Sequence, residues 1–386
     1  MSAGIVSLLL WSYLALFRGG FWRIGRFRID RLEGRSQQTG PDTFSVAAVI
    51  PARDEADVIS GCIRSLLEQN AARVQVFLVD DGSSDGTAEV ARRAAAESGR
   101  AEQLTVIQGA ALPRGWSGKL WAVRQGIEKA RSFNPDYLLL TDADIMHAPD
   151  DLLRLARMAR RGQYDLVSLM VRLNCQTFAE RMLIPPFVFF FFKLYPPAWV
   201  ADKDRRIAGA AGGCMLVRPQ ALERAGGIES IRQEIIDDCA LARRIKNSGG
   251  RIWLGIADGT KSIRPYGSFA EIGQMISRNA FNQLRHSALL LALSLAGLAM
   301  VYLLPPALLF FHKTGTAALG GAAWLLMAIC FVPTVRYYRL SPMWALLLPL
   351  SALFYMGATV HSAAKFWTGK GGQWKGRVQD PAGGHG

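Results

Sequence analysis

The apolar residues of this chain are gathered into four long runs, at residues 4–17, 289–311, 317–335 and 343–364. Most charged residues lie between the first run and the second. Each of the three C-terminal runs approaches the roughly 20 apolar residues that an α-helix needs to cross the hydrocarbon core of a bilayer. In a chain that is 50% hydrophobic, this segregation predicts a soluble domain bracketed by membrane helices.

The first run is expected to be a retained membrane anchor over residues 1–20. No basic residue precedes it and no small-residue cleavage pattern follows it, unlike in a secretory signal peptide. The arginines that follow it closely are Arg18, Arg23, Arg26, Arg28 and Arg31. Because basic residues concentrate on the cytoplasmic side, the large domain is expected to face the cytoplasm from the inner membrane. Basic clusters at this place favour anionic lipid over nucleic acid, and no RNA-binding motif is visible.

The C-terminal runs conflict with that rule. If all three cross the membrane, the basic tail at residues 365–386 lies outside. One run is therefore expected to bend or re-enter, and the runs at residues 289–311 and 343–364 are the candidates because both contain proline. The phenylalanine-rich stretch at residues 184–197 is short and bracketed by prolines, so we expect an interfacial element, or a core segment, rather than a span.

Between residues 45 and 260, apolar strand-like runs alternate with amphipathic helical stretches. The expected strands are residues 46–50, 74–79, 104–107 and 137–141, and the expected helices are residues 58–68, 87–98 and 120–131. Strands separated by helices of this length imply a parallel sheet with right-handed crossovers. The sequence thus predicts an α/β domain of nucleotide-binding type, then an amphipathic connection at residues 261–286 and transmembrane helices at residues 287–364.

The turns after the first two strands differ from common nucleotide-binding loops. Residues 50–55, IPARDE, match neither a dinucleotide-binding glycine pattern nor a Walker loop. NAD enzymes and P-loop ATPases are disfavoured, as is a nucleotidyltransferase, which usually has a glycine-rich basic loop there. Residues 79–87, VDDGSSDGT, combine glycines for a tight turn with side chains that can accept hydrogen bonds from a base or ribose.

Two carboxylates follow the fourth expected strand. Asp142 and Asp144 emerge at its carboxyl end, where open α/β sheets place their ligands. Such a pair can hold Mg²⁺ or Mn²⁺ against a diphosphate, although an isolated Asp-x-Asp also fits a turn or a helix cap. His147 is a further candidate metal ligand or acceptor contact, with a structural histidine as the commoner alternative.

These three motifs, in this order and spacing, resemble those of the family 2 inverting glycosyltransferases, which use nucleotide-diphosphate sugars. The resemblance covers roughly residues 45–256. It is greatest to the membrane-bound hopene-associated (hopanoid-biosynthesis) glycosyltransferases, with ceramide glucosyltransferases as more distant relatives. It implies an α/β nucleotide-diphospho-sugar transferase domain of the A type, Rossmann-like with a mostly parallel sheet, a UDP-sugar donor and a lipid acceptor.

The resemblance also implies roles for individual residues. Those expected in the nucleotide pocket are Pro51, Arg53, Glu55, Asp80 and Asp81. Asp142 would contact the donor and, with Asp144, bind Mg²⁺ or Mn²⁺ on its diphosphate. Lys119, in residues 115–122 (GWSGKLWA), would reach a phosphate or the donor sugar. The alternative for that stretch is a loop with two packing tryptophans and a solvated lysine.

An acidic pair ahead of a helix is the expected catalytic element. Asp237 and Asp238 resemble the family's acidic pair, with Asp237 in place of the commoner glutamate. The resemblance implies that Asp238 takes the proton from the acceptor hydroxyl as that oxygen attacks the anomeric carbon, which inverts its configuration. The alternative is that both carboxylates only favour the helix amino terminus through its dipole.

Two further pairs complete the expected site. Gly212 and Gly213 would let the backbone approach the sugar or acceptor, or would simply form the tight start of a strand. Gln274 and Arg278 resemble the Gln-x-x-Arg-Trp element of membrane relatives, and Arg278 would hold the diphosphate. Asn279 replaces the tryptophan, which favours transfer of one sugar per acceptor over polymer synthesis.

The sequence therefore predicts a membrane-anchored inverting glycosyltransferase that moves a sugar from a nucleotide diphosphate to a lipid. A hopanoid acceptor rests on the resemblance alone, and polyprenyl phosphate or a ceramide-like lipid is the alternative. A catalytically silent membrane scaffold on the same fold is the non-enzyme alternative. The intact Asp142, Asp144 and Asp238 speak against the scaffold.

Overall fold

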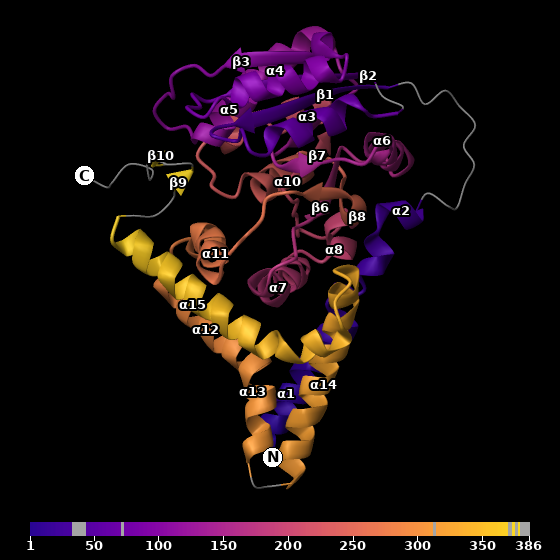
Figure 1. Ribbon diagram of the computed structural model, residues 1–386. Helices are drawn as coiled ribbons and strands as arrows, with labels where there is room; N and C mark the ends of the chain where they lie inside the picture. Colours follow the sequence, from indigo (N-terminus) through magenta and orange to yellow (C-terminus); the bar gives the residue numbers. More distant parts are fainter. Residues whose placement is uncertain (33–43, 71–72, 312–313, 370–372, 375–376, 379–386) are drawn as a thin grey trace. The chain divides into compact units, whose positions relative to one another are not determined.

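The structure is a computed structural model that describes residues 1–32, 44–70, 73–311, 314–369, 373–374 and 377–378 (Figure 1). The chain divides into two compact units. The helical unit comprises residues 1–26, 174–199 and 265–372, and the α/β unit comprises residues 27–173, 200–264 and 373–386. Most of the predicted basic tail at residues 365–386 lies outside the described residues.

An eight-stranded mixed sheet forms the centre of the α/β unit, in the order β3-β2-β1-β4-β7-β6-β8-β5. Its strands are β1 (Ser45–Ala52), β2 (Arg73–Asp80), β3 (Leu104–Gln108), β4 (Tyr137–Thr141), β5 (Ile145–Met146), β6 (Leu166–Arg172), β7 (Cys214–Val217) and β8 (Ile252–Ser262). The first four run parallel, β7 is antiparallel to β4 and β6, and β5 is antiparallel to β8. The four strands predicted from the sequence are confirmed.

Helices cover both faces of this sheet. They are α3 (Ile59–Leu67), α4 (Thr87–Glu97), α5 (Gly118–Ala130), α6 (Asp151–Arg161), α9 (Pro219–Arg224) and α10 (Asp237–Asn247). Alternate residues of β1 face opposite sides: Val46 and Ile50 join the core formed with α3, α4 and α6, whereas Val49 faces α5. The close approach of α5 depends on Gly126, because a Cβ there would lie 2.5 Å from Cγ1 of Val49.

The strand order changes direction between β1 and β4. From β1 the chain passes through β2 to β3 at one edge of the sheet, and then returns to β4 on the other side of β1. Open α/β sheets bind ligands outside the carboxyl ends of their strands at such a point. Arg53, Asp81 and Asp142 directly follow β1, β2 and β4. The topology therefore gathers polar side chains where a ligand crevice is expected.

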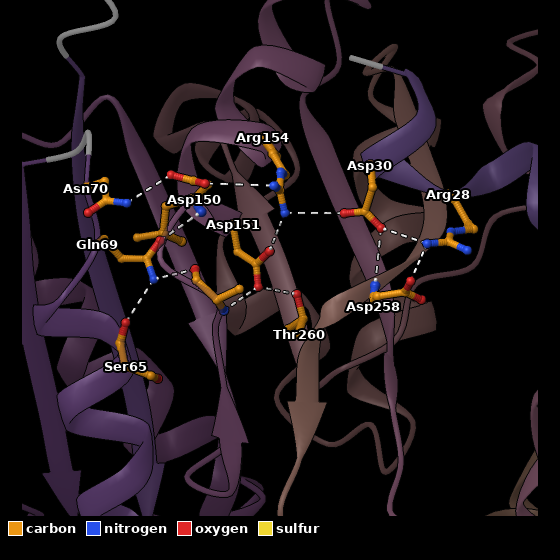
Figure 2. Close-up of polar contacts among 12 residues, drawn as sticks. Arg28, Asp30, Ser65, Gln69, Asn70, Asp150, Asp151, Arg154, Asp258 and Thr260 are labelled. Atoms are coloured by element: carbon orange, nitrogen blue, oxygen red, sulfur yellow. Dashed lines mark hydrogen bonds and ion pairs between the residues drawn. The ribbon is translucent and has the colours of Figure 1, made fainter. Parts of the chain in front are cut away.

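A chain of ion pairs holds α2 (Ile29–Leu32) to the α/β unit (Figure 2). Arg28 pairs with Asp258 of β8 and lies 3.5 Å from Asp30. Asp30 in turn lies 3.4 Å from Arg154 of α6. These alternating charges fix the segment that follows the N-terminal helix to the edge of the sheet.

The helical unit contains α1 (Ser2–Phe17), α7 (Phe178–Leu194), α11 (Phe269–Gln283), α12 (Ala288–Leu298), α13 (Leu304–Ala307), α14 (Thr314–Tyr337) and α15 (Leu348–Trp367). Among the described residues, four helical stretches are long and apolar enough to cross a membrane: Phe178–Ala201, Ala288–Phe310, Thr314–Tyr337 and Pro342–Trp367. The helix α1 is apolar but shorter. By length and composition, this is the organisation of a membrane protein.

The stretch at residues 184–197 belongs to a longer helix than its prolines suggested, and its burial agrees with the core-segment alternative. The helix α7 begins at Phe178 and carries Pro185 and Pro186 in its interior. Pro186 has no N–H, so the carbonyl of Met182, four residues earlier, loses its helical partner. The hydroxyl of Ser351 in α15 donates a hydrogen bond to that carbonyl at 2.8 Å. A donor from another helix therefore lets α7 continue through the prolines.

The predicted interruption at Pro305 takes the form of a π-helical turn over Ala299–Leu303. Pro305 leaves the carbonyl of Val301 without its helical donor. The indole Nε1 of Trp11 donates a hydrogen bond to this carbonyl at 2.7 Å, and Trp11 is fully buried. The N-terminal helix thus completes the backbone hydrogen bonding of the proline-interrupted helix. Pro349, in contrast, lies in the first turn of α15, where proline is tolerated.

Replacing Trp11 by phenylalanine should destabilise the helical unit by about 1–3 kcal/mol, because the carbonyl of Val301 would remain buried without a donor. Phenylalanine keeps an aromatic ring against Tyr302, so the loss reports mainly on the hydrogen bond. The measurement is the apparent melting temperature of the detergent-purified protein. Trp367→Phe is the matched control, because that side chain is 59% exposed. Equal melting temperatures for Trp11→Phe and the wild type would contradict this role.

Candidate functional site

Lys119 lies in the first turn of α5, which begins at the strand-end side of the sheet. The hydroxyl of Ser117 caps this helix by accepting a hydrogen bond from the N–H of Leu120 at 3.3 Å. The N–H of Ser117 donates in turn to the carbonyl of Arg232 at 2.8 Å. An ammonium group at a helix amino terminus opposes the helix dipole. The position of Lys119 therefore requires carboxylates close by.

Two aspartates supply that charge. Nζ of Lys119 lies 3.0 Å from Oδ1 of Asp142 and 3.2 Å from Oδ2 of Asp237. Burial alone would lower the pKa of Lys119, but the charges of Asp142, Asp237 and Asp238 outweigh burial and raise that pKa. Lys119 thus remains a cation that joins the end of β4 to the first turn of α10. We call these four residues the lysine–aspartate cluster.

Asp238 is held by the backbone on both of its oxygens. Oδ2 accepts a hydrogen bond from the N–H of Gly212 at 2.9 Å, and Oδ1 accepts one from the N–H of Cys239 at 2.6 Å. Burial, together with the charge of Asp237, raises the pKa of Asp238 to about 6. A Cβ at Gly212 would lie 3.4 Å from Oδ2 of Asp238. The structure therefore combines a glycine, a fixed carboxylate and a pKa suited to proton transfer near neutrality.

Asp144 has partners that the sequence did not indicate. Its Oδ2 accepts a hydrogen bond from the hydroxyl of Ser262 and lies 3.7 Å from Nε of Arg264. Arg264 also forms an ion pair with Glu55. It therefore contacts both Asp144, the second predicted metal ligand, and a residue of the predicted nucleotide pocket. Ser262 ends β8, which runs two residues beyond the expected domain boundary at residue 260. The sequence signal for Ser262 and Arg264 is that both are polar residues at the end of a strand, but they belong to no recognisable motif.

Among the residues predicted for the nucleotide pocket, Asp81 contacts Arg53, whereas Asp80 stabilises its own turn. Nη1 of Arg53 donates a hydrogen bond to the carbonyl of Asp81 at 2.7 Å and lies 3.6 Å from its Oδ2. Asp80 serves its own turn instead, because its Oδ1 accepts a hydrogen bond from the N–H of Ser83 at 2.9 Å. Both aspartates are buried. Of the two, Asp81 is therefore the one that pairs with Arg53.

Five of the predicted residues line one small cavity of about 20 Å³, which has room for about one water molecule. They are Pro51, Lys119, Asp142, Gly212 and Asp237. The fold therefore brings the ends of β1 and β4, Gly212 and the starts of α5 and α10 to one place. Gly213 lies on the core side, where a Cβ would meet Ile145 and Val171 at 3.3 Å.

Other candidates lie apart from this cluster. His147 is 4% exposed, and its Nε2 lies 3.2 Å from Oγ1 of Thr141. Burial lowers the pKa of His147 to about 4, so the ring is neutral, as expected for a structural histidine. Gln274 and Arg278 lie one turn apart on the exposed side of α11 in the helical unit. Their approach to the aspartates of the α/β unit stays a prediction.

Residues 47–226 match the family model described as glycosyl transferase family 2. This stretch contains Lys119, Asp142 and Gly212, and it ends shortly before Asp237 and Asp238. These residues are similar to a family 2 glycosyltransferase domain.

Two curated relatives show the range of similar proteins. The undecaprenyl-phosphate 4-deoxy-4-formamido-L-arabinose transferase of Pseudomonas fluorescens (strain SBW25) is 33% identical over 177 residues, which are 44% of this chain and 45% of that protein. An N-acetylglucosaminyltransferase of Rhizobium leguminosarum bv. viciae is 33% identical over 137 residues, which are 35% of this chain and 30% of that protein. The chain thus spans less than half the length of either relative. Neither is a hopene-associated enzyme.

The solved structure of a mannosyltransferase from Pyrobaculum calidifontis, in complex with GDP-Man and Mn²⁺, is similar in fold, with a TM-score of 0.53. It is 19% identical in sequence, and the similarity covers 92% of this chain and 98% of that one. The predicted A-type nucleotide-diphospho-sugar transferase fold, with a mostly parallel sheet, is thereby confirmed.

Lys119→Met should lower the stability of the ligand-free protein by about 1–2 kcal/mol, because the partly exposed carboxylates of Asp142 and Asp237 lose their counterion. In a double-mutant cycle, Asp237→Asn should cost less in the Lys119→Met background than in the wild type. The measurement is the melting temperature of all four proteins. Lys129→Met on the exposed side of the same helix is the control. Additive losses would show that Lys119 and Asp237 do not interact.

Proposed function

We propose that this chain is a membrane-bound inverting glycosyltransferase that moves a sugar from a nucleotide-diphosphate sugar, with UDP as the expected nucleotide, to a lipid phosphate. The lysine–aspartate cluster carries this proposal. It joins the carboxylate at the end of β4 to the acidic pair of α10, within or directly beside a domain of the matching family. A scaffold has no need of such an arrangement of buried charges.

The proposed chemistry is a single displacement. The acceptor oxygen attacks the anomeric carbon from the face opposite the nucleotide, the bond from that carbon to the diphosphate oxygen breaks, and the configuration inverts. Lys119 would hold donor oxygens through its ammonium group, while Arg53, Glu55 and Asp81 form the nucleotide pocket. Gln274 and Arg278 of α11 are proposed to contact the diphosphate. Gly212 leaves room for the sugar beside Asp238.

Asp142 and Asp144 are the residues that would hold Mg²⁺ or Mn²⁺. Burial raises the pKa of Asp142, the positive charge of Lys119 lowers it, and the negative charge of Asp144 raises it. The carboxylates of Asp142 and Asp144 therefore favour a bound cation. Across the described ranges, no group of three histidine, cysteine or acidic side chains could hold a metal alone. The pair still fits, because magnesium-type sites commonly combine one or two carboxylates with substrate phosphates. When bound, the cation would neutralise charge on the leaving diphosphate.

The curated relative that acts on undecaprenyl phosphate supports a polyprenyl phosphate as the acceptor. Four helices long enough to cross a membrane fit such an insoluble substrate. We propose a multi-pass protein of the inner membrane with its α/β unit in the cytoplasm, where nucleotide sugars are available. A hopanoid hydroxyl remains the second candidate, because Asp238 has the raised pKa and fixed orientation of a general base.

The test is sugar transfer by the full chain in lipid nanodiscs, with a panel of labelled nucleotide sugars and three acceptors: undecaprenyl phosphate, a hydroxylated hopanoid and ceramide. We expect one donor to be consumed, product on undecaprenyl phosphate, and loss of product on adding EDTA. Asp144→Asn should abolish transfer. No glycolipid product from any donor and acceptor would contradict an enzyme and favour the scaffold.

The effect of Asp238→Asn should depend on the acceptor. A hydroxyl must lose its proton during attack, so removal of the base should slow transfer by about 10²–10⁴-fold. A lipid phosphate attacks through an oxygen that is already ionised, so the same variant should then retain transfer within about tenfold. The measurement is kcat with saturating donor on both acceptor types. A large loss on undecaprenyl phosphate would contradict a purely orienting role for Asp238 there.

The pH profile completes this prediction. With a hydroxyl acceptor, Asp238 must be ionised, so kcat should rise with pH up to about 6 and level above it. Asp238→Asn should remove that rise. With a lipid phosphate, whose second ionisation also lies near pH 6, the variant should keep the rise because the acceptor itself titrates.

A further inference from the structure

The positive charge of this chain is concentrated in the helical unit. Its residues include twelve lysines and arginines but only two carboxylates, Glu180 and Glu271. The whole chain has a net charge of +14, so most of the excess lies in this unit. The helical unit therefore carries cations that its own carboxylates cannot neutralise.

Both carboxylates are also committed to the ends of helices. Glu180 is fully buried and accepts hydrogen bonds from the backbone N–H groups of Gln176, Thr177 and Tyr266 at 2.8 Å each. Glu271 accepts one from the N–H of Gly267 at 2.9 Å. Within the described part of the helical unit, neither carboxylate forms an ion pair with a lysine or an arginine. Any counterion for these cations must come from outside the helical unit.

Lys193 is the cation most affected by this lack of carboxylates in the helical unit. It lies in the last turn of the apolar helix α7, and its Nζ donates a hydrogen bond to the buried hydroxyl of Tyr302 at 2.9 Å. The ammonium also lies 4.6 Å from the centre of the Tyr302 ring and 5.5 Å from that of Phe190. An ammonium has three donors, and Tyr302 satisfies one. Ionisable residues in such helices are costly and mark binding or transport sites.

A second cation lies against the first. Arg18 directly follows α1, and its Nε donates a hydrogen bond to the carbonyl of Lys193 at 3.1 Å. Its guanidinium lies 4.7 Å from the ring of Trp199. The charges of Arg18 and Lys193 are close enough to repel each other. Two adjacent cations without a carboxylate are costly near a membrane, and an anion bound by both would reduce that cost.

Apolar side chains border these two cations. Leu16 and Phe17 directly precede Arg18 and are 68% and 66% exposed, and Leu194 directly follows Lys193 and is 48% exposed. Trp199 adds an aromatic ring of the kind that concentrates at membrane interfaces. A ligand for this place therefore has an anionic head and an apolar tail. A free inorganic anion would leave the three exposed apolar side chains uncovered.

We propose that Arg18, Lys193 and Tyr302 form a binding site for the phosphate group of a lipid. The phosphate oxygens would accept hydrogen bonds from the remaining donors of both cations, and the hydrocarbon chain would cover Leu16, Phe17 and Leu194. Basic pockets between membrane helices bind phospholipid headgroups in this way. The site stands independently of the proposed transfer reaction, because it follows from the helical unit alone.

The test is competition binding to the full chain, purified in a neutral detergent. Phosphatidylglycerol with a fluorescent label on its acyl chain is the probe. The unlabelled competitors are undecaprenyl phosphate, phosphatidylglycerol, phosphatidylcholine and inorganic phosphate. Lys193→Met and Arg18→Gln should each weaken probe binding about fivefold, the amount expected for one cation at a lipid surface. Lys193→Arg should retain binding. Arg336→Gln is the matched control, an exposed cation in the last turn of α14.

Displacement of the probe by undecaprenyl phosphate but not by phosphatidylcholine would support the site. If undecaprenyl phosphate competes more strongly than unlabelled phosphatidylglycerol, the ligand is the polyprenyl lipid. Equal competition by those two anionic lipids would identify a general lipid phosphate. Equal binding of phosphatidylcholine, or displacement by inorganic phosphate at the same concentration, would overturn the proposal. A lower melting temperature of Lys193→Met with unchanged probe binding would show that the cations only stabilise helix ends. Sugar transfer, measured separately, decides the proposed function.

Discussion

The ion pairs of Lys119 hold the site together, and the rest of the α/β unit can be understood from them. A cation at the start of a helix is unfavourable on its own, so Asp142 and Asp237 beside Lys119 stabilise the first turn of α5. Those two aspartates come from β4 and α10, which are distant in sequence. The close packing of α5 at Gly126 sets the distance from this helix to the sheet. The same contacts thus stabilise the fold and preorganise polar groups for a charged donor.

The part of the site that the sequence revealed consists of residues next to strand ends and helix starts. Asp81 and Asp142 could be placed because hydrophobic periodicity marks the strands that they follow, whereas Asp238 could be placed only through the family resemblance. Arg264 and Ser262 could not, because their contacts with Glu55 and Asp144 arise from β8 returning beside β5, 118 residues after Asp144 in the case of Ser262. No local pattern encodes that pairing. It depends on the whole sheet.

The helices of the helical unit also depend on contacts that the sequence alone does not predict. Proline rules argue against a long helix through Pro185 and Pro186 and predict an interruption at Pro305. In the structure, Ser351 and Trp11 donate to the carbonyls that these prolines leave open, from 169 and 290 residues away. Where such a distant donor exists, a proline costs little and the helix continues, as an α-helix or through a π-helical turn. A sequence shows the missing N–H but not the side chain that replaces it.

The two units differ in how their charged side chains are neutralised. In the α/β unit, acidic side chains outnumber nearby cations around Lys119, so the site favours a cation such as a divalent metal. In the helical unit, Arg18 and Lys193 have no carboxylate partner among the described residues, so that place favours an anion. A transferase that joins a nucleotide-bound sugar to a lipid phosphate handles both kinds of charge. The unequal distribution of acidic and basic residues along the chain therefore agrees with the proposed transfer of a sugar to a lipid phosphate.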